Sequence, residues 1–134
     1  MKTEVAAIAM VLLLGTLATG CISMGPSDRE MLAQLQSYGA RIPENQLKSP
    51  VAAGALNVLP GIGNFYLAVG AGQSNQWIFG ILNLVTWPVS ILWGIPEAAI
   101  DAQTINKLDT VSYYRYNPLG KKKFQELKAA ARSE

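Results

Sequence analysis

The pattern of apolar and polar positions predicts helices along the whole chain. Residues 6–17 are apolar, and residues 28–38 place apolar side chains at the spacing of one helical face. Residues 50–71 and 77–100 form two longer apolar segments, joined by a polar loop without charge. Residues 117–132 open with Asn-Pro, a cap and first-turn pair, and carry apolar side chains on one side. The predicted fold class is therefore all-α.

Local signals set the expected ends of these helices. Ser27 and Glu30 have the spacing of a capping box, and Gly39 is a helix stop. The Ser-Pro pair at 49–50 predicts a capped helix start. Residues 60–64 read Pro-Gly-Ile-Gly-Asn and break the first apolar segment, because proline lacks an amide hydrogen and glycine favours turns.

The second apolar segment is expected to form one continuous helix. Its 24 residues would extend about 36 Å, compared with about 30 Å for the hydrocarbon core of a bilayer. It lacks charge before residue 97 and contains three tryptophans, which favours a lipid interface: Trp77, Trp87 and Trp93. Pro88 and Pro96 leave a re-entrant or interfacial hairpin open as the alternative to a full span.

The polar residues of this segment share one line on a helical wheel. At about 100° per residue, eight side chains fall within roughly 60° of that line: Gln76, Gly80, Asn83, Thr86, Ser90, Gly94, Glu97 and Asp101. Small and hydrogen-bonding residues on an otherwise apolar helix favour close helix packing within a bilayer. We expect the seven residues from Gly80 to Asp101 to form such a packing stripe. The alternatives are a soluble helical core, or a segment broken at Pro88 and Pro96, to which the helical wheel does not apply.

The N-terminus is typical of a secretory signal. Residues 1–20 carry a basic residue, Lys2, near the start and continue into an apolar stretch that is too short to span a bilayer comfortably. The letters Ala-Thr-Gly-Cys, ending at Cys21, resemble the lipobox of bacterial lipoproteins. The resemblance implies cleavage between Gly20 and Cys21, with a diacylglycerol and an N-acyl chain such as palmitate on Cys21. An uncleaved signal anchor with a buried cysteine is the alternative.

The residue after the cysteine bears on localisation. Ile22 stands where an aspartate tends to signal retention in the inner membrane of proteobacteria. By the same resemblance, the chain is expected in the cell envelope, on the periplasmic face of the outer membrane of a Gram-negative host.

Composition excludes several function classes. The chain has 134 residues, 15% of them charged, one cysteine and no histidine, and residues 49–96 carry no charge. A soluble domain normally has about a quarter of its residues charged. Zinc sites built on histidine and catalytic triads cannot form within this chain. We therefore expect no enzymatic activity, no catalytic residues, no metal and no cofactor beyond the acyl chains.

A second resemblance lies in the apolar region. The motifs that carry it are residues 61–67 (Gly-Ile-Gly-Asn-Phe-Tyr-Leu), residues 77–82 (Trp-Ile-Phe-Gly-Ile-Leu), Trp93, and an acid at Glu97 or Asp101. Together they resemble the TM2 domain, a pair of membrane helices with a short connection. Asn64 stands where that family usually has a basic residue. The resemblance covers about residues 53–101 and implies a helical hairpin that enters a membrane.

These observations divide the chain into four stretches. They are a signal peptide (1–20), a lipid-anchored helix and linker (21–49), a TM2-like apolar hairpin (50–106) and a mildly basic segment (107–134). Charges flank the hairpin on both sides while its connecting loop has none. Because burying an ion in lipid is costly, we expect both flanks on the side of the lipid anchor and the loop in the bilayer.

The C-terminal stretch has seven basic and three acidic residues. The excess either contacts anionic lipid headgroups or acidic wall polymers, or forms a solvated helix face. Residues 111–116 are rich in tyrosine, and we expect a short extended segment there.

The predicted architecture is a small membrane-associated helical hairpin flanked by short amphipathic helices. The predicted function is that of an envelope lipoprotein with a structural, scaffolding or assembly-accessory role, acting through helix–helix association. The expected partners are membrane lipids and either another protein or a second copy, with no nucleic acid and no small-molecule substrate. The alternative is a small transport or permeability component lined by Asn83, Ser90 and Glu97.

Overall fold

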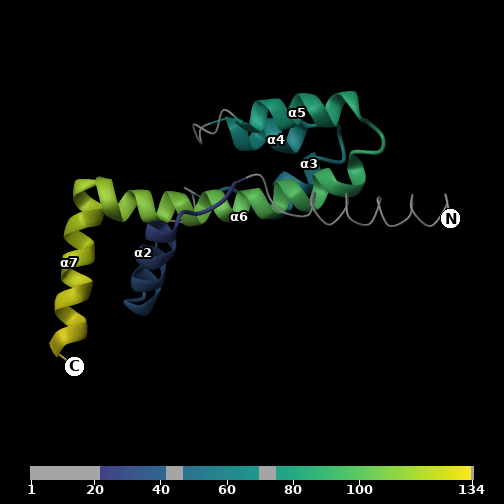
Figure 1. Ribbon diagram of the computed structural model, residues 1–134. Helices are drawn as coiled ribbons and strands as arrows, with labels where there is room; N and C mark the ends of the chain where they lie inside the picture. Colours follow the sequence, from purple (N-terminus) through teal and green to yellow (C-terminus); the bar gives the residue numbers. More distant parts are fainter. Residues whose placement is uncertain (1–21, 42–46, 70–74, 134) are drawn as a thin grey trace. The chain divides into compact units, whose positions relative to one another are not determined.

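The computed structural model describes residues 22–41, 47–69 and 75–133, and their regular structure is entirely α-helical. The all-α fold class is therefore confirmed for these residues. The predictions for the signal peptide, for cleavage at Gly20 and for lipidation of Cys21 lie outside them. Figure 1 shows the labelled helices in chain order: α2 (Pro26–Ser37), α3 (Pro50–Leu56), α4 (Ile62–Ala68), α5 (Asn75–Val85), α6 (Ile91–Tyr116) and α7 (Pro118–Ser133).

The chain folds into two compact units. Unit 1 contains Ile22 and residues 48–103, which include α3, α4, α5 and the first half of α6. Unit 2 contains residues 23–47 and 104–133, which include α2, the second half of α6 and α7. The N-terminal helix and the C-terminal segment, which the sequence analysis treats as separate stretches, thus belong to one unit.

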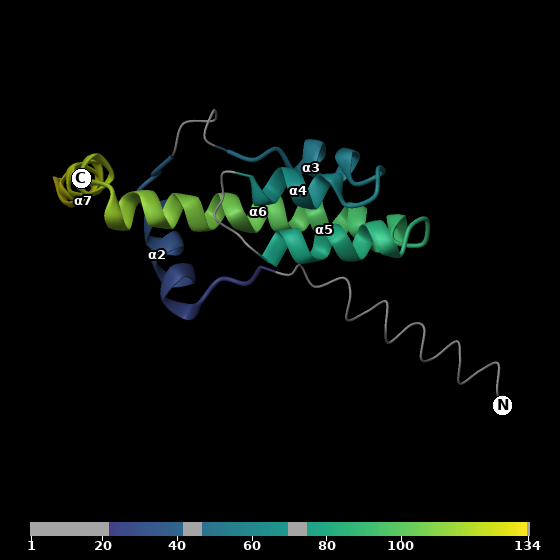
Figure 2. The same cartoon turned by 90° about the horizontal axis from the view of Figure 1, so that it is seen from above.

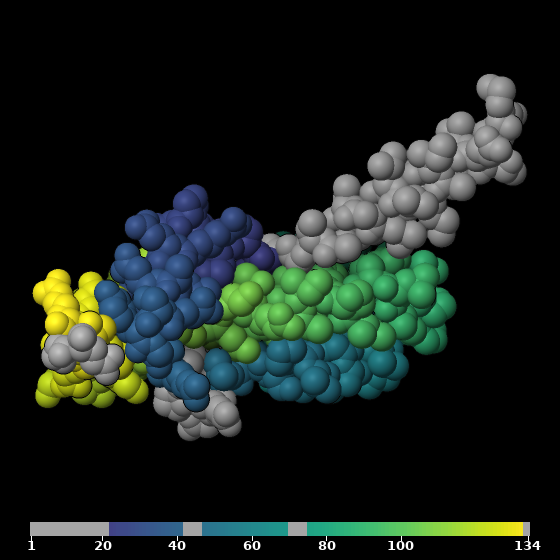
Figure 3. Space-filling view, turned by 90° about the horizontal axis from the view of Figure 1, so that it is seen from below, coloured from purple at the N-terminus to yellow at the C-terminus, as the bar shows by residue number. Residues whose placement is uncertain are grey.

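Unit 1 consists of two helical hairpins. Residues 57–61 turn the chain from α3 into α4, and residues 86–90 turn it from α5 into α6. Figures 1 and 2 show both turns at the same end of unit 1. On the face seen in Figure 3, α3 and the first half of α6 lie side by side, and the backbone of Gly54 approaches Ile95.

The expectation of one continuous helix over residues 77–100 is wrong. The chain leaves the helix after Val85, and α6 begins only at Ile91. Pro88 has no amide hydrogen to donate, and its ring disfavours a helical conformation at Trp87. Pro96 lies inside α6, so only the first of the two prolines stops the helix.

Several local predictions for helix ends are confirmed. The Ser49 hydroxyl accepts a hydrogen bond from the Ala52 amide at 3.1 Å, at the start of α3. The Asn117 side chain accepts one from the Leu119 amide at 2.9 Å, at the start of α7. Gly39, with φ 66°, follows the end of α2 as the predicted stop.

The predicted capping box of α2 is wrong. The helix starts at Pro26 with Gly25 as its cap residue, and no side chain caps it. Because Pro26 already takes the first helical position, Ser27 lies inside the first turn. The hydroxyl of Ser27 therefore cannot take the place of the cap residue.

Unit 2 has an ordinary apolar core. Leu35 of α2 packs with Val111 and Tyr114 of α6, and Phe124 of α7 lies against this cluster. The extended segment expected at residues 111–116 is wrong, because these residues are part of α6. In a helix, Val111 and Tyr114 lie three positions apart and share one face, so the helical form buries both together.

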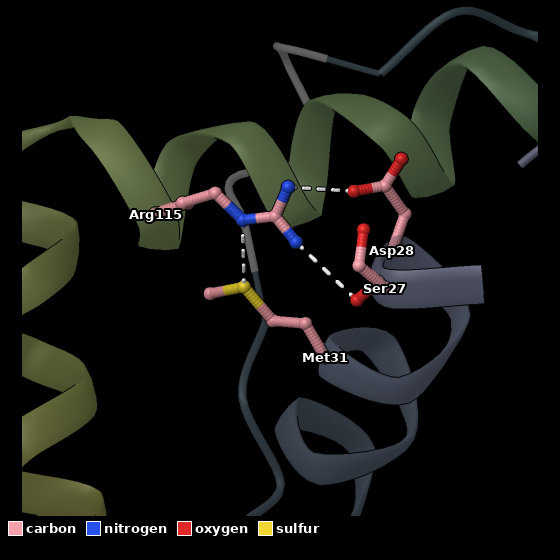
Figure 4. Close-up of polar contacts among 4 residues, drawn as sticks. All are labelled: Ser27, Asp28, Met31 and Arg115. Atoms are coloured by element: carbon pink, nitrogen blue, oxygen red, sulfur yellow. Dashed lines mark hydrogen bonds and ion pairs between the residues drawn. The ribbon is translucent and has the colours of Figure 1, made fainter. Parts of the chain in front are cut away.

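Arg115 connects α6 to the first turn of α2. Its guanidinium donates to Asp28 at 2.6 Å and to the Ser27 carbonyl at 3.3 Å, and its Nε lies 3.4 Å from the Met31 sulfur (Figure 4). The hydrogen bond to Asp28 raises the pKa of Arg115 above its ordinary value, with a further contribution from Tyr116. This ion pair links α6 to α2 beside Met31, which packs against the core of unit 2.

Candidate functional site

Unit 1 places polar side chains in its interior. Seven polar or charged residues of the described chain are buried, and all belong to unit 1: Asn57, Asn64, Gln76, Asn83, Ser90, Glu97 and Asp101. Asn64, Gln76 and Asp101 are completely inaccessible. Unit 2 shows the usual arrangement, with Leu35, Val111 and Tyr114 at its centre.

The surface of unit 1 is apolar. Of the eighteen exposed large hydrophobic residues in the described chain, fifteen belong to unit 1: Val51, Val58, Leu59, Ile62, Val69, Trp77, Ile78, Ile81, Leu82, Leu84, Val85, Trp87, Val89, Leu92 and Ile100. Water-soluble monomers rarely expose large contiguous apolar patches, and buried polar side chains are the exception in them. Leu67 and four alanines are buried in unit 1 as well. Unit 1 therefore combines an unusually polar interior with an unusually apolar surface.

A directed chain of hydrogen bonds crosses the interior of unit 1. The Trp93 indole donates to the Asn83 oxygen at 3.0 Å, and the Asn83 amide donates to the Asn64 oxygen at 2.8 Å. Asn64 donates to the Gln76 oxygen at 2.9 Å, and Gln76 donates to the Asp101 carboxylate at 2.5 Å. Each amide both accepts and donates, and the carboxylate is the final acceptor.

Asn57 and Ser90 form further buried hydrogen bonds with the backbone of three helices. Asn57 donates to the Gly94 carbonyl at 2.5 Å and accepts from the Gly63 amide at 3.0 Å. The Ser90 hydroxyl donates to the Asn83 carbonyl at 2.8 Å. No buried side-chain nitrogen or oxygen atom in the described part of the chain lacks a partner. A fully satisfied polar interior of this kind is rigid and does not require water.

The residues of the predicted packing stripe lie on two facing helices, α5 and α6, and in the turn between them. Six of the seven are buried, namely Gly80, Asn83, Ser90, Gly94, Glu97 and Asp101. Thr86 is half-buried in the turn, where its hydroxyl donates to the Leu82 carbonyl at 2.8 Å. Because the chain reverses at residues 86–90, the α5 members face the α6 members, and the Gly94 backbone packs on Asn83. The stripe thus forms the interior of one unit.

Two residues of this interior were not identified as site residues from the sequence. Asn57 contributes to no predicted motif, and Asn64 was noted only as a departure from the TM2 pattern. Both are asparagines within a run of 48 uncharged residues, and this was the available signal.

One end of unit 1 is polar. The Lys48 ammonium donates to the Val69 carbonyl at 2.7 Å and lies 4.8 Å from the centre of the Tyr66 ring. The Ile22 amide donates to Asp101 at 3.2 Å, on the carboxylate that also accepts from Gln76. We call this the polar end of unit 1.

The opposite end of unit 1, at the turns 57–61 and 86–90, is apolar. Six exposed hydrophobic side chains gather in and beside these turns, each 52–76% exposed: Val58, Leu59, Val85, Trp87, Val89 and Leu92. We call this the apolar tip. Val69 and Gln76, which flank the loop expected to enter the bilayer, lie at the polar end with Lys48 and Asp101.

The described residues contain no group of three or more histidine, cysteine or acidic side chains able to hold a metal ion. Glu97 and Asp101, the acidic pair of α6, are both buried and engaged in interactions. No helix in the described part of the chain is both long and apolar enough to cross a membrane. The chain matches no protein-family model, no curated protein and no solved structure.

Proposed function

We propose that this protein is an envelope lipoprotein whose unit 1 inserts into one leaflet of a membrane, apolar tip first, while unit 2 remains in water as a structural or assembly-accessory element. The observation that carries the proposal is that unit 1 buries seven polar side chains, all with hydrogen-bond partners, and exposes fifteen large apolar ones. An apolar solvent offers no hydrogen-bond partners, so polar groups must find them within the protein. The buried polar side chains of unit 1 already have such partners, and its surface side chains are mostly apolar.

The length of the hairpins favours one leaflet. From Gln76 at the polar end to Val85 at the tip, α5 advances nine residues, which is about 14 Å of helix. The hydrocarbon core of a bilayer is about 30 Å thick. The tip thus reaches about the middle of the bilayer. Of the alternatives that the prolines leave open, this distance supports the re-entrant hairpin.

Burial of the exposed side chains supplies the driving force for insertion. A large apolar side chain contributes about 1.5–3 kcal/mol when it passes completely from water to an apolar medium. Fifteen such residues, most of them about half exposed, therefore correspond to a stabilisation on the order of 10 kcal/mol or more. Residues 49–96 carry no charge, so inserting this part of unit 1 involves no cost of ion burial.

The lipid anchor and the hairpins are proposed to act together. Ile22 directly follows the lipobox cysteine in the sequence, and its amide is bound to Asp101 at the polar end. An acylated Cys21 would accordingly enter the membrane at the level where the hairpins enter it. The TM2 resemblance fits this proposal as a likeness to a membrane-entering helical hairpin.

The permeability alternative receives less support. Asn83 and Ser90 form hydrogen bonds within one copy of unit 1, and Glu97 is only 5% exposed. These side chains are part of an interior that is already satisfied. A path between protomers requires them on a surface.

The double anchor is tested by removing the acylation site. The Cys21→Ser protein is made with residues 1–20 replaced by a signal peptide that is cleaved without lipidation. We expect it to stay in the membrane fraction after a high-salt wash, because unit 1 still inserts. Adding Val85→Asp and Val89→Asp should release it, since each charge in the hydrocarbon region costs about 2.5–3.5 kcal/mol. Fractionation with immunodetection provides the measurement.

The matched control places the same charges in unit 2. Tyr116→Asp and Leu119→Asp replace side chains that are 67% and 70% exposed, and in the Cys21→Ser background they should leave the protein in the membrane fraction. Recovery of the Cys21→Ser protein itself in the soluble fraction would contradict the insertion of unit 1.

A further inference from the structure

Unit 2 contains a cavity of about 310 Å³ between α2 and the second half of α6. One part of its lining is apolar and includes Leu32 and Leu47. Gln36 and Thr110 add hydrogen-bonding groups, and Arg41 and Lys107 add positive charge. The lining thus combines apolar surface, neutral polar groups and two cations.

The two cations are available to a ligand. Arg41 and Lys107 are both exposed, and neither forms an ion pair within the described residues. The backbone at Arg41 is held in place because its carbonyl accepts a hydrogen bond, at 2.8 Å, from the hydroxyl of Tyr114. Tyr114 is only 1% exposed and belongs to the core of unit 2. Arginine and lysine with adjacent hydrogen-bond donors are suited to bind a phosphate group.

We propose that this cavity binds the headgroup of an anionic phospholipid. Arg41 and Lys107 contact the phosphate, and Leu32 and Leu47 contact the glycerol and the first acyl methylenes. The inference rests on the proposed function in one respect, which is proximity to the membrane. Pro26 begins α2 five residues after Cys21 in the sequence, so the proposed acylation site lies close to α2 along the chain.

The test measures binding of the full chain, as its Cys21→Ser form, to vesicles by flotation. Vesicles of phosphatidylcholine alone are compared with vesicles that also contain phosphatidylglycerol. We expect tighter binding to the anionic vesicles, and an Arg41→Gln, Lys107→Gln variant should lose at least about tenfold of that preference. Gln36→Trp, which narrows the cavity at an exposed position without a change of charge, should also reduce the preference.

The control variant Lys121→Gln, Lys122→Gln removes the same charge from the exposed surface of α7. It should lose clearly less of the preference than the cavity variant. Equal losses in the two variants would overturn the site, because they would show a general charge effect. Cavity-dependent binding of inorganic phosphate, without any preference for anionic vesicles, would overturn the lipid assignment. Binding to pure phosphatidylcholine reports on unit 1 alone, and its loss would instead contradict the proposed function.

Discussion

The amide side chains in the interior of unit 1 have an orientation that their partners determine. Asn64 donates to Gln76 and accepts from Asn83, so reversing its amide would set donor against donor and acceptor against acceptor. The orientation of the Gln76 amide is also fixed, because its nitrogen donates to the Asp101 carboxylate and its oxygen accepts from Asn64. A chain of this type has one low-energy arrangement, and this specifies how the helices of unit 1 pair.

Replacing Asn64 tests the contribution of this chain. Asn64→Leu preserves the approximate volume but leaves the Gln76 oxygen and an Asn83 amide hydrogen unsatisfied in a dry interior. Each unsatisfied group costs about 1–3 kcal/mol, so we expect a loss of about 2–6 kcal/mol in the free energy of unfolding. Tryptophan fluorescence during denaturation in detergent measures it, because all three tryptophans belong to unit 1.

Asn75→Leu provides the matched control. Asn75 lies exposed at the start of α5, and we expect its replacement to change stability by less than about 0.5 kcal/mol. If Asn64→Leu were as stable as this control, the interior network would not hold unit 1 together.

At the scale of elements, α4 and α5 pack through glycine. A side chain at Gly80 would overlap the ring of Phe65, and one at Gly61 would overlap the backbone of Gly80. Phe65 also contacts Trp77, with ring centres 5.3 Å apart. The close approach of the two helices brings Asn64 within reach of Gln76 and thereby supports the polar interior.

This packing predicts coupling between Gly80 and Phe65. Gly80→Ala should reduce the free energy of unfolding by about 1–3 kcal/mol, because the added methyl group overpacks the interface. In the Phe65→Leu background the same change should cost at least about 1 kcal/mol less, since the smaller side chain can move aside. A double-mutant cycle in detergent measures the coupling.

Gly54 serves as the control glycine for this cycle. It packs on the Ile95 carbonyl across α3 and α6, where a methyl group is tight but is not in overlap. Gly54→Ala should show no coupling to Phe65→Leu. Additive effects of Gly80→Ala and Phe65→Leu would contradict the proposed contact between α4 and α5.

The helix ends show how far local sequence determines the fold. Ser49, Asn117 and Gly39 act as predicted because each satisfies or ends its own helix. The reversal at residues 86–90 was missed, because periodicity does not distinguish a helix that tolerates proline, as at Pro96, from one that stops at Pro88. That outcome depends on contacts between helices, such as the bond from Ser90 to the Asn83 carbonyl.

The candidate site was predicted in part for the same reason. Polar residues on one line of a helical wheel were expected on one packing face, and six of the seven are buried. Two of their partners, Asn57 at the end of α3 and Asn64 in α4, were not predicted. Both reach the stripe residues only through contacts between helices, with Gly94 and with Asn83. The pattern therefore located the interior, and the structure shows which residues complete it.

At the scale of the whole molecule, the two units distribute polar and apolar side chains differently. Unit 2 has an apolar core and basic residues on its surface. Unit 1 buries seven polar side chains and exposes fifteen large apolar ones. This contrast is the basis of the proposed function.

The depth of insertion tests this account most directly. Spin labels are placed at Val89→Cys in the tip and at Gln103→Cys at the end of unit 1, both in the Cys21→Ser protein bound to vesicles. Accessibility to oxygen and to a water-soluble paramagnetic reagent then reports the depth of each label. From Ile91 to Gln103, α6 advances twelve residues, so we expect the label at 89 to lie about 18 Å deeper than the label at 103. The label at 103 should be accessible to the water-soluble reagent. If the label at 89 were as accessible to the water-soluble reagent as the label at 103, insertion into one leaflet would be contradicted. Access of the reagent to residue 89 from the opposite side of the membrane would contradict it as well.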